Sequence, residues 1–543
     1  MKKRSIALML VMVMVLTTLL SACGGGTTPA KKEEKVLTVA SNMNMTTTEP
    51  WKSTTDGDYY IFYQIYSRLV QTDFRGNYYP DLADSWECAD DGVTWTFHLE
   101  KNFPWQRGND LFGNDLVQVT ADDVKATLEY VMDPANACSR LDDLASTIAS
   151  IEVVDDKTIK IVTKDIDVLL LYKMAAICIM PKKGIDEGWD FASKPVGSGA
   201  FKWDSNIVDT QVVLVANEDY YIKPNIDKVI YKFVTETSVA AMALANKEVD
   251  FVTYFAYNEM PTIQGHDFIE VYSGSSTCRW AAMNVTYDLF KDVRVRRAIA
   301  SYIDMDALVA AVYPDDGTGV VQAVRAYGQI PPENAGGDQE RAKKVTPPYD
   351  PAAGDKLMEE AGWKKNAKGI WEKDGQTFTF DIQVGTNDPI RLNCSVLMAT
   401  MLNDAGFECQ SKAVEWGTHL SDLSAGNCAM YIVGGYSGVD GPMKVMHTDN
   451  TGSFSPNPGY SNPEVDALLE KAWKTTDDDA RAELIMQAQE KWLYDTVFLP
   501  MYHAYNFQAY NKEKVKDFFV NGCTNIEFNL VSELRNVDVD MSK

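Results

Sequence analysis

The chain has 543 residues and a formal net charge of −26, with 45% hydrophobic and 24% charged residues. A surface this acidic repels nucleic acid and anionic lipid headgroups, so we expect neither as a partner. The composition is that of a globular protein, and the length exceeds what a single hydrophobic core supports. We therefore expect about three domains.

The first 22 residues have the layout of an export signal. Residues 2–4 are basic, and residues 6–20 form an apolar core that is short for a transmembrane helix, which needs roughly 20 residues. The following Leu-Ser-Ala-Cys sequence at 20–23 resembles a bacterial lipobox, in which Cys23 is acylated and the chain is cut before it. A plain secretory signal with an ordinary Cys23 is the alternative.

Residues 23–35 are rich in Gly, Thr, Pro, Lys and Glu, which cannot bury enough apolar surface to fold. They predict a flexible tether. Loss of the signal, which carries three basic and no acidic residues, moves the net charge to −29. No later stretch approaches 18 uncharged apolar residues. We expect an exported protein, lipid-anchored to the outer face of the cell membrane or its periplasmic side.

Strand and helix patterns alternate along the first half of the chain. In order they predict a strand at 36–41, a helix at 59–70, a strand at 93–99, a helix at 120–132 and strands at 157–163, 211–217 and 228–234. Thr120 followed by Asp123 is a capping signature at the start of the second helix.

The second half continues the mixture. The patterns predict a helix running into a strand at 238–255, a helix at 292–313, a Pro/Gly-rich loop at 328–351, a strand at 377–384 and a helix beginning at Asn462-Pro463. Alternation in the strand at 377–384 puts Phe378, Phe380, Ile382 and Val384 on one face. The whole pattern indicates an α/β protein.

Five segments spread over most of the chain carry a resemblance to a known family. They are PDLADSWECADDGVTWTFHLEKN with TADDVKATLEY, KPVGSGAFKW, MNVTYDLFKDVRVRRAIASYIDMDAL, YDPAAGDKLMEEAGW and GYSNPEVDALLEKA. In this order they resemble blocks of the extracellular solute-binding proteins of the peptide/nickel transporter type, family 5.

The resemblance implies a two-lobed, periplasmic-binding-protein type II (Venus-flytrap) fold with an extra subdomain inserted in the first lobe. The expected boundaries are lobe I at 36–285 with the insertion at about 79–195, lobe II at 286–500, and a return to lobe I at 501–543. The chain would cross between the lobes near 280–290 and near 500. It also implies capture of a solute by hinge closure, and delivery to the permease of an ABC importer.

The family's peptide-binding members carry a G-W-x-x-D segment whose aspartate pairs with the peptide ammonium. The matching stretch here is GGYSGVDGP, with Tyr436 at the tryptophan position, Val439 where the aspartate belongs, and Asp440 one position later. The family's early D-P is also changed, to Glu49-Pro50. Asp440 is therefore a candidate for the ammonium group, or a turn residue before Gly-Pro.

Aromatic residues in loops and strand ends offer another interpretation, because flat rings stack on sugar faces. The candidates are Trp51, Tyr254, Phe255, Tyr257, Trp280, Trp416 and Tyr436. Arg279, beside Trp280, is a candidate for a ligand carboxylate. An oligosaccharide is thus the alternative to a peptide, and core packing is the alternative role for each ring.

The sequence favours a binding protein without a cofactor over an enzyme. GYSGV fails the G-x-S-x-G pattern at Val439, and neither H-E-x-x-H nor a phosphate loop occurs. The five histidines are scattered, so no metal site is expected. His503, near the second crossing, is a candidate ligand contact or a structural residue. The eight cysteines after Cys23 contain no C-x-x-C pair, and their pairing stays open.

The basic run DVRVRRAIA could suggest phosphate binding. We expect Arg294, Arg296 and Arg297 instead to be solvated or to form structural ion pairs.

Overall fold

The computed structural model describes residues 33–72, 77–315, 317, 320–386, 388–435, 445–449, 459–518, 529–532 and 535–543. The predicted signal, Cys23, Tyr436 and Asp440 lie outside the described residues.

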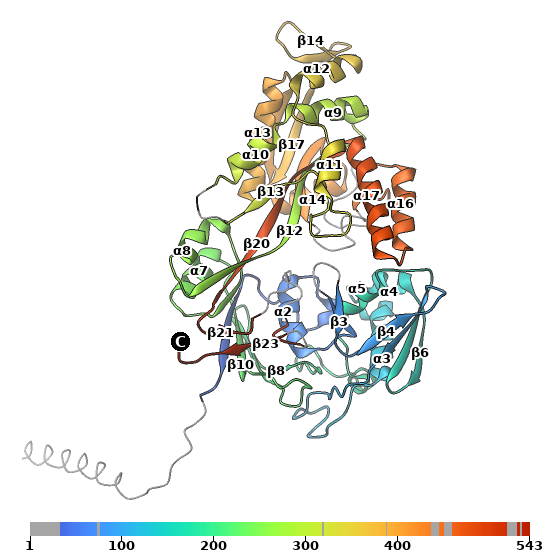
Figure 1. Cartoon of the computed structure of the whole chain (residues 1–543), viewed down its shortest axis with the longest axis vertical. Coiled ribbons are helices and arrows are strands. Elements are labelled where there is room, and N and C mark those ends of the chain that lie inside the picture. The colour runs from blue at the N-terminus through green and yellow to red at the C-terminus, as the bar shows by residue number, and fades with distance from the viewer. Residues whose placement is uncertain are drawn as a thin grey trace, which may run out of the picture.

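A mixed sheet of eleven strands runs through both halves of the molecule (Figure 1). Its order is β18-β17-β19-β12-β20-β11-β1-β10-β9-β8, with β13 beside β20. The strands are β1 (Val36–Ser41), β8 (Phe201–Ile207), β9 (Gln211–Ala216), β10 (Lys228–Phe233), β11 (Phe251–Phe255), β12 (Ile269–Met283), β13 (Ala323–Arg325), β17 (Thr379–Gly385), β18 (Glu408–Val414), β19 (Met430–Gly435) and β20 (Phe498–Asn511).

Strands β12 and β20 connect the two halves. The start of β12 pairs antiparallel with the end of β20, which also pairs with β11, whereas the end of β12 pairs with β19. The β12–β20 register shifts between Ser273 and Ser276, which marks a bulge between the two halves. We infer that the chain crosses between lobes at this bulge, a few residues before the expected range.

The hydrophobic cores divide along the same line. One core unites β1, α2 and the elements up to β10 with Phe251 of β11 and with five residues near the end of the chain, Val515, Leu530, Val531, Val537 and Val539. A small core packs α7 and α8 against β11. Two further cores draw their buried residues from the range 278–502. The chain thus buries its apolar residues in two bodies joined by β12 and β20.

The first body contains a second sheet of four antiparallel strands, ordered β4-β5-β7-β6. Its elements are β4 (Ser85–Cys88), β5 (Thr94–His98), β6 (Ile148–Asp155), β7 (Thr158–Thr163), α3 (Ala121–Met132), α4 (Leu141–Thr147), α5 (Leu170–Ala175) and α6 (Lys182–Glu187). The capping box predicted for α3 is present, with the Thr120 N–H donating to Asp123 Oδ2 at 2.9 Å. The strands and helices of this unit lie between Ser85 and Glu187.

The remaining helices are distributed over both halves of the molecule, and several of them contact strands of the main sheet. They are α2 (Asp56–Ile65), α7 (Thr237–Ala245), α8 (Met260–Gln264), α9 (Val293–Tyr302), α10 (Met305–Val312), α11 (Gln339–Val345), α12 (Pro351–Glu360), α13 (Pro389–Asp404), α14 (Trp416–Ser424), α16 (Pro463–Trp473) and α17 (Asp478–Asp495), with 3-10 turns η1 (Pro50–Lys52), η2 (Pro134–Asn136), η3 (Tyr257–Glu259) and η4 (Asp288–Phe290).

Short sheets complete the fold. Three are pairs, formed by β2 (Val70–Thr72) with β3 (Tyr78–Pro80), β21 (Val515–Lys516) with β24 (Asp538–Val539), and β22 (Val531–Ser532) with β23 (Arg535–Asn536). Another has three strands in the order β14 (Lys364–Lys365), β15 (Trp371–Lys373) and β16 (Gln376–Thr377).

Three predicted elements differ from the structure. The helix expected at 292–313 is two helices, because Asp304 caps α10 by accepting the Ala307 N–H. The loop expected at 328–351 contains α11, whose N-terminus is capped by Asp338. The helix expected to reach residue 70 ends at Ile65. The first two differences arise at the capping residues Asp304 and Asp338, because the sequence pattern does not distinguish them from the interior of a helix or from a loop.

Candidate functional site

The carboxyl ends of parallel strands mark one edge in each half of the molecule. In the second half β17 pairs parallel with β18 and β19, and these strands end at Gly385, Val414 and Gly435. In the first half β1 pairs parallel with β10 and β11. Ligands of open α/β sheets bind outside such carboxyl ends.

Both edges end at the hinge strands. Phe255, the last residue of β11, pairs with Phe507 on one side of the β12 bulge. Gly435, the last residue of β19, pairs with Cys278 on the other side. The two carboxyl edges therefore meet at the hinge, and we call the surfaces on either side of it the interlobe edges.

Arg279 lies at the second-half edge. Its Nη1 donates to Thr277 Oγ1 at 2.6 Å, and a Cβ on Gly434 would lie 2.2 Å from Arg279 Cδ. Gly434 must therefore be glycine for the arginine to pass across β19.

Three tyrosines share the electrostatic neighbourhood of Arg279. Burial raises the pKa of Tyr254, and that of Tyr313 to about 12, while the charge of Arg279 acts in the opposite direction on both. Tyr502 pairs with Arg279 across the β12–β20 ladder, and its ring lies 5.1 Å from that of Tyr313. The arginine thus sits among phenols that stay protonated at neutral pH.

A second polar group lies where β17 and β18 end. Asp388 caps α13 and pairs with Arg391, Nε to Oδ2 at 2.8 Å. The Arg391 guanidinium in turn lies 5.0 Å from the ring centre of Trp416, at the start of α14. Asp388 and Arg391 are not among the residues predicted from the sequence, although Asp-Pro shortly after a strand is a recognisable helix start.

The structure contradicts the prediction that the rings of Trp280 and Trp51 contact a ligand. Trp280 is fully buried in a core, with its ring 6.4 Å from Phe498, because it points to the opposite face of β12 from Arg279. Trp51 is 5% exposed and packs edge-on against Tyr130 and Phe191. These rings serve core packing.

His503 is also enclosed. It is fully buried opposite Cys278, on the same face of the sheet as Trp280. Burial lowers the pKa of its imidazole to about 3. We therefore remove Trp51, Trp280 and His503 from the candidate ligand contacts.

The other described candidates keep positions near the edges. Phe255 is buried against Phe507, whereas Tyr254 and Tyr257 are half-buried at the end of β11 and just after it. Tyr257 lies 5.7 Å from the Phe507 ring. Arg279, Tyr254, Tyr257 and Trp416 are the predicted residues that the structure leaves available at the interlobe edges.

The two halves also meet away from the hinge (Figure 1). The Lys474 ammonium pairs with Asp165, and the Val168 N–H donates to Trp473 O at 3.3 Å. A hollow of about 630 Å³ lies beside this contact, with Trp473 on one wall and residues of the four-stranded unit on the other. The end of α16 thus rests on the loop before α5.

A family model for bacterial extracellular solute-binding proteins, family 5, matches residues 77–457. The chain belongs to this family. The match confirms the resemblance noted in the sequence and the predicted two-lobed α/β fold, so the two bodies are the lobes of a solute-binding protein. Members are receptors of solutes rather than enzymes.

Relatives named as peptide-binding proteins span most of this solute-binding protein. Di/tripeptide-binding protein 1 of Pseudomonas aeruginosa is 26% identical over 492 residues, covering 84% of this chain and 86% of its own. The oligopeptide-binding protein AppA of Bacillus subtilis is 26% identical over 491 residues, 84% of each chain. The periplasmic binding protein DppA from Helicobacter pylori, solved with the peptide STSA, superposes with a TM-score of 0.71 at 24% identity, covering 93% of this chain and 98% of its own.

The basic run of this solute-binding protein has a structural role. Arg294 pairs with Asp292 at 2.6 Å. Arg296 is buried and donates to the carbonyl oxygens of Phe290, Lys291 and Asp495, and Arg297 donates to Tyr494 O. Arg294 thus forms an ion pair as expected, whereas Arg296 and Arg297 tie α9 to its surroundings through backbone carbonyl oxygens rather than through carboxylates.

Three further features of the described part of the chain are its candidate metal ligands, its cysteines and its apolar helices. There, no group of three or more His, Cys, Asp or Glu side chains is placed to hold a metal ion. The seven described cysteines are free thiols, and all but Cys88 are buried. Among the described residues, no helix combines the length and hydropathy needed to cross a bilayer.

Proposed function

We propose that this protein captures a short peptide between its interlobe edges and hands it to the permease of an ABC importer. The observation that carries the proposal is Arg279, which stands where the edges meet and has no carboxylate partner among the described residues. An unpaired guanidinium beside tyrosine hydroxyls suits the α-carboxylate of a peptide, because it can make two parallel hydrogen bonds. The named functions of the relatives point to the same ligand class.

We further propose that Asp440, or the segment around it, receives the peptide ammonium, and that Tyr436 and Trp416 flank the bound chain. The contact of α16 with the four-stranded unit supports closure, since it adds a second junction that opening of the hinge would break. A lipid on Cys23 would keep the receptor beside its permease.

The oligosaccharide alternative is less well supported. Sugar stacking needs open aromatic faces, but Trp51 and Trp280 are buried and Arg391 lies over the ring of Trp416. We therefore favour the peptide.

Replacement of Arg279 by glutamine should weaken binding of a free peptide about tenfold, because a charge-assisted hydrogen bond contributes roughly 1.5–3 kcal/mol. Calorimetric titration of the whole chain with short peptides, after a melting-temperature screen, measures the effect. A peptide amidated at its carboxyl end should bind the parent protein about tenfold more weakly than the free peptide does. On R279Q the amidated and the free peptide should bind with equal affinity.

Arg294→Gln is the matched control, since that surface guanidinium already pairs with Asp292. Equal losses in R279Q and R294Q, or tight binding of the amidated peptide, would remove Arg279 from the site. A melting-temperature rise with oligosaccharides and none with peptides would overturn the peptide assignment itself.

A further inference from the structure

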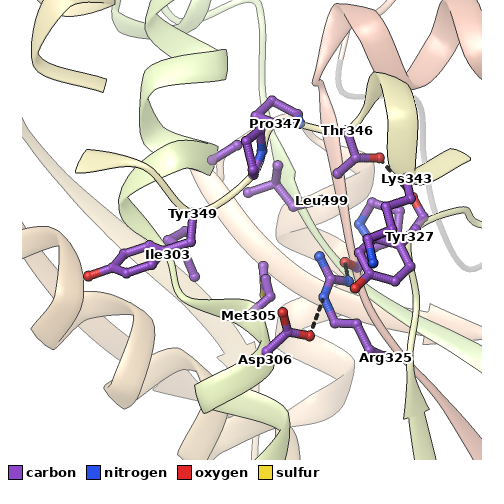
Figure 2. Close-up of a pocket in the computed structure, with 13 residues that line it drawn as sticks. Ile303, Met305, Asp306, Arg325, Tyr327, Lys343, Thr346, Pro347, Tyr349 and Leu499 are labelled. Atoms are coloured by element: carbon purple, nitrogen blue, oxygen red, sulfur yellow. Dashed lines mark hydrogen bonds and ion pairs between the residues drawn. The ribbon is translucent and has the colours of Figure 1, made fainter. Parts of the chain in front are cut away.

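A pocket of about 170 Å³ lies in lobe II, between β13, the start of α10 and the segment after α11 (Figure 2). We call it the β13 pocket. Its lining includes Arg325, Tyr327 and Lys343 and none of the residues of the interlobe edges. It is therefore a separate cavity from the proposed peptide site.

One side of the β13 pocket is basic. Arg325 Nη1 donates to Pro500 O at 2.8 Å and Met501 O at 3.2 Å, which fixes the guanidinium against β20. Its Nε is buried and makes no hydrogen bond with any residue that the structure describes, while Asp306 Oδ1 lies 3.9 Å away. The backbone thus holds the Arg325 guanidinium in place, and its Nε–H can donate a hydrogen bond to a ligand.

Lys343 completes the basic side. Its ammonium lies 4.9 Å from the ring centre of Tyr327, and the Arg325 guanidinium lies 4.8 Å from the same ring. Figure 2 shows the three side chains grouped together. In the described part of the chain, Lys343 has no acidic partner. Lys343 and the carboxylate of Asp306 are both exposed at the mouth of the pocket, whereas Arg325 is largely buried, so two positive charges line the cavity against one negative charge.

The opposite side is apolar. Ile303, Met305, Leu499 and Pro347 line it, and Figure 2 shows Ile303 and the Tyr349 ring across the cavity from the two cations. The volume is close to that of an engineered cavity of about 150 Å³ that holds benzene. An occupant needs one anionic end and a compact apolar body.

We propose that the β13 pocket binds a small organic monocarboxylate with an apolar body of about the size of a benzene ring. The carboxylate would lie between Arg325 and Lys343, where charge-assisted hydrogen bonds are strongest, and the body would fill the space against Leu499 and Ile303. An inorganic phosphate suits the pocket less well, because its second charge would face Asp306 and it would leave the apolar wall unfilled.

Benzoate is the probe, with the whole chain titrated by calorimetry. Lys343→Gln should raise the benzoate Kd about tenfold, and Ala300→Leu, which fills the pocket without changing its charge, should abolish binding. Lys344→Gln is the matched control, because Lys344 is exposed on the same helix but does not line the pocket. We expect K344Q to keep the parent Kd within twofold.

Two further ligands and one variant separate the remaining outcomes. Benzyl alcohol and inorganic phosphate should each bind at least tenfold more weakly than benzoate, and R279Q should leave benzoate binding unchanged. The proposal is overturned by undetectable benzoate binding, an unaltered Kd in K343Q, equal binding of benzyl alcohol or phosphate, or loss of benzoate binding in R279Q. The last result would place benzoate at the interlobe edge and leave the peptide proposal standing.

Discussion

Replacing Gly197 with alanine should destabilise the protein by about 3 kcal/mol or more, since the added methyl group has no space. A Cβ at this position would lie 2.0 Å from the carbonyl oxygen of Ile65, 2.7 Å from its carbonyl carbon and 3.1 Å from Tyr66 Cα. All three atoms belong to the backbone at the end of α2, so no side-chain rotation relieves the clash.

The hydrogen bonds at this junction explain the size of the effect. Ile65 O accepts the Gly199 N–H at 2.8 Å and Gln106 Nε2 at 3.1 Å, and Gln106 is itself buried. Pushing the chain away from α2 would break the Gly199 bond and leave a buried carbonyl less well paired. Overpacking costs about 1–3 kcal/mol and an unsatisfied buried group about 1–3 kcal/mol more.

Urea denaturation measures the loss, with Gly265→Ala as the control. Gly265 ends α8 with a helical φ of −66° and ψ of −2°, and the atom nearest to its built Cβ is 3.6 Å away. Alanine there should change stability by less than about 1 kcal/mol, in the favourable direction. Similar unfolding midpoints for G197A and G265A would show that α2 and the Gly197 segment are not in the contact described.

This contact illustrates what the sequence could and could not reveal. The segment KPVGSGAFKW is recognisable in the sequence as a family block. The sequence does not show why its glycines are needed, because the backbone that they contact, at Ile65, is far away in the chain. Local patterns were sufficient where neighbours along the chain decide the structure. Examples are the capped start of α3 and the buried face of β17 with Phe378, Phe380, Ile382 and Val384.

The candidate site was predicted less completely, for the same physical reason. Arg279 and Trp280 are adjacent and looked equally available, yet they point to opposite faces of β12. Which face is covered depends on Phe498 and Val433, residues of two other strands. Asp388, Arg391 and Trp416 likewise meet only because β17 and β18 end side by side.

Replacing His503 with leucine should raise the free energy of unfolding at acid pH relative to the parent protein. The imidazole is fully buried on β20, and burial lowers its pKa to about 3, whereas that of an unfolded histidine is about 6.5. Below pH 6.5 the His503 imidazole is protonated in the unfolded chain but stays neutral in the folded protein. The stability contributed by the neutral ring is therefore complete above pH 6.5 and is lost as the pH falls towards 3.

The expected slope is about 1.4 kcal/mol per pH unit, or about 3 kcal/mol between pH 6.5 and pH 4.5. Asp81 acts in the opposite direction, because burial raises its pKa from 3.8 to about 6. Its protonated form stabilises the fold fully below pH 3.8, and that contribution is lost as the pH rises through 6. Between pH 4 and pH 6 the two groups offset each other, so the parent profile is flatter than His503 alone would make it.

H503L distinguishes the contribution of His503 to the pH dependence of stability from that of Asp81. From pH 7.5 to pH 4.5, the unfolding free energy of H503L should gain about 3 kcal/mol relative to the parent, because the Asp81 effect is common to both proteins. Met501→Leu, a buried and non-titrating change on the same strand, should keep a constant difference from the parent at every pH. Urea denaturation at intervals of one pH unit measures both. Parallel profiles of H503L and the parent across this range would contradict the prediction, because they would show that the buried His503 ring is protonated in the folded protein as readily as in the unfolded chain.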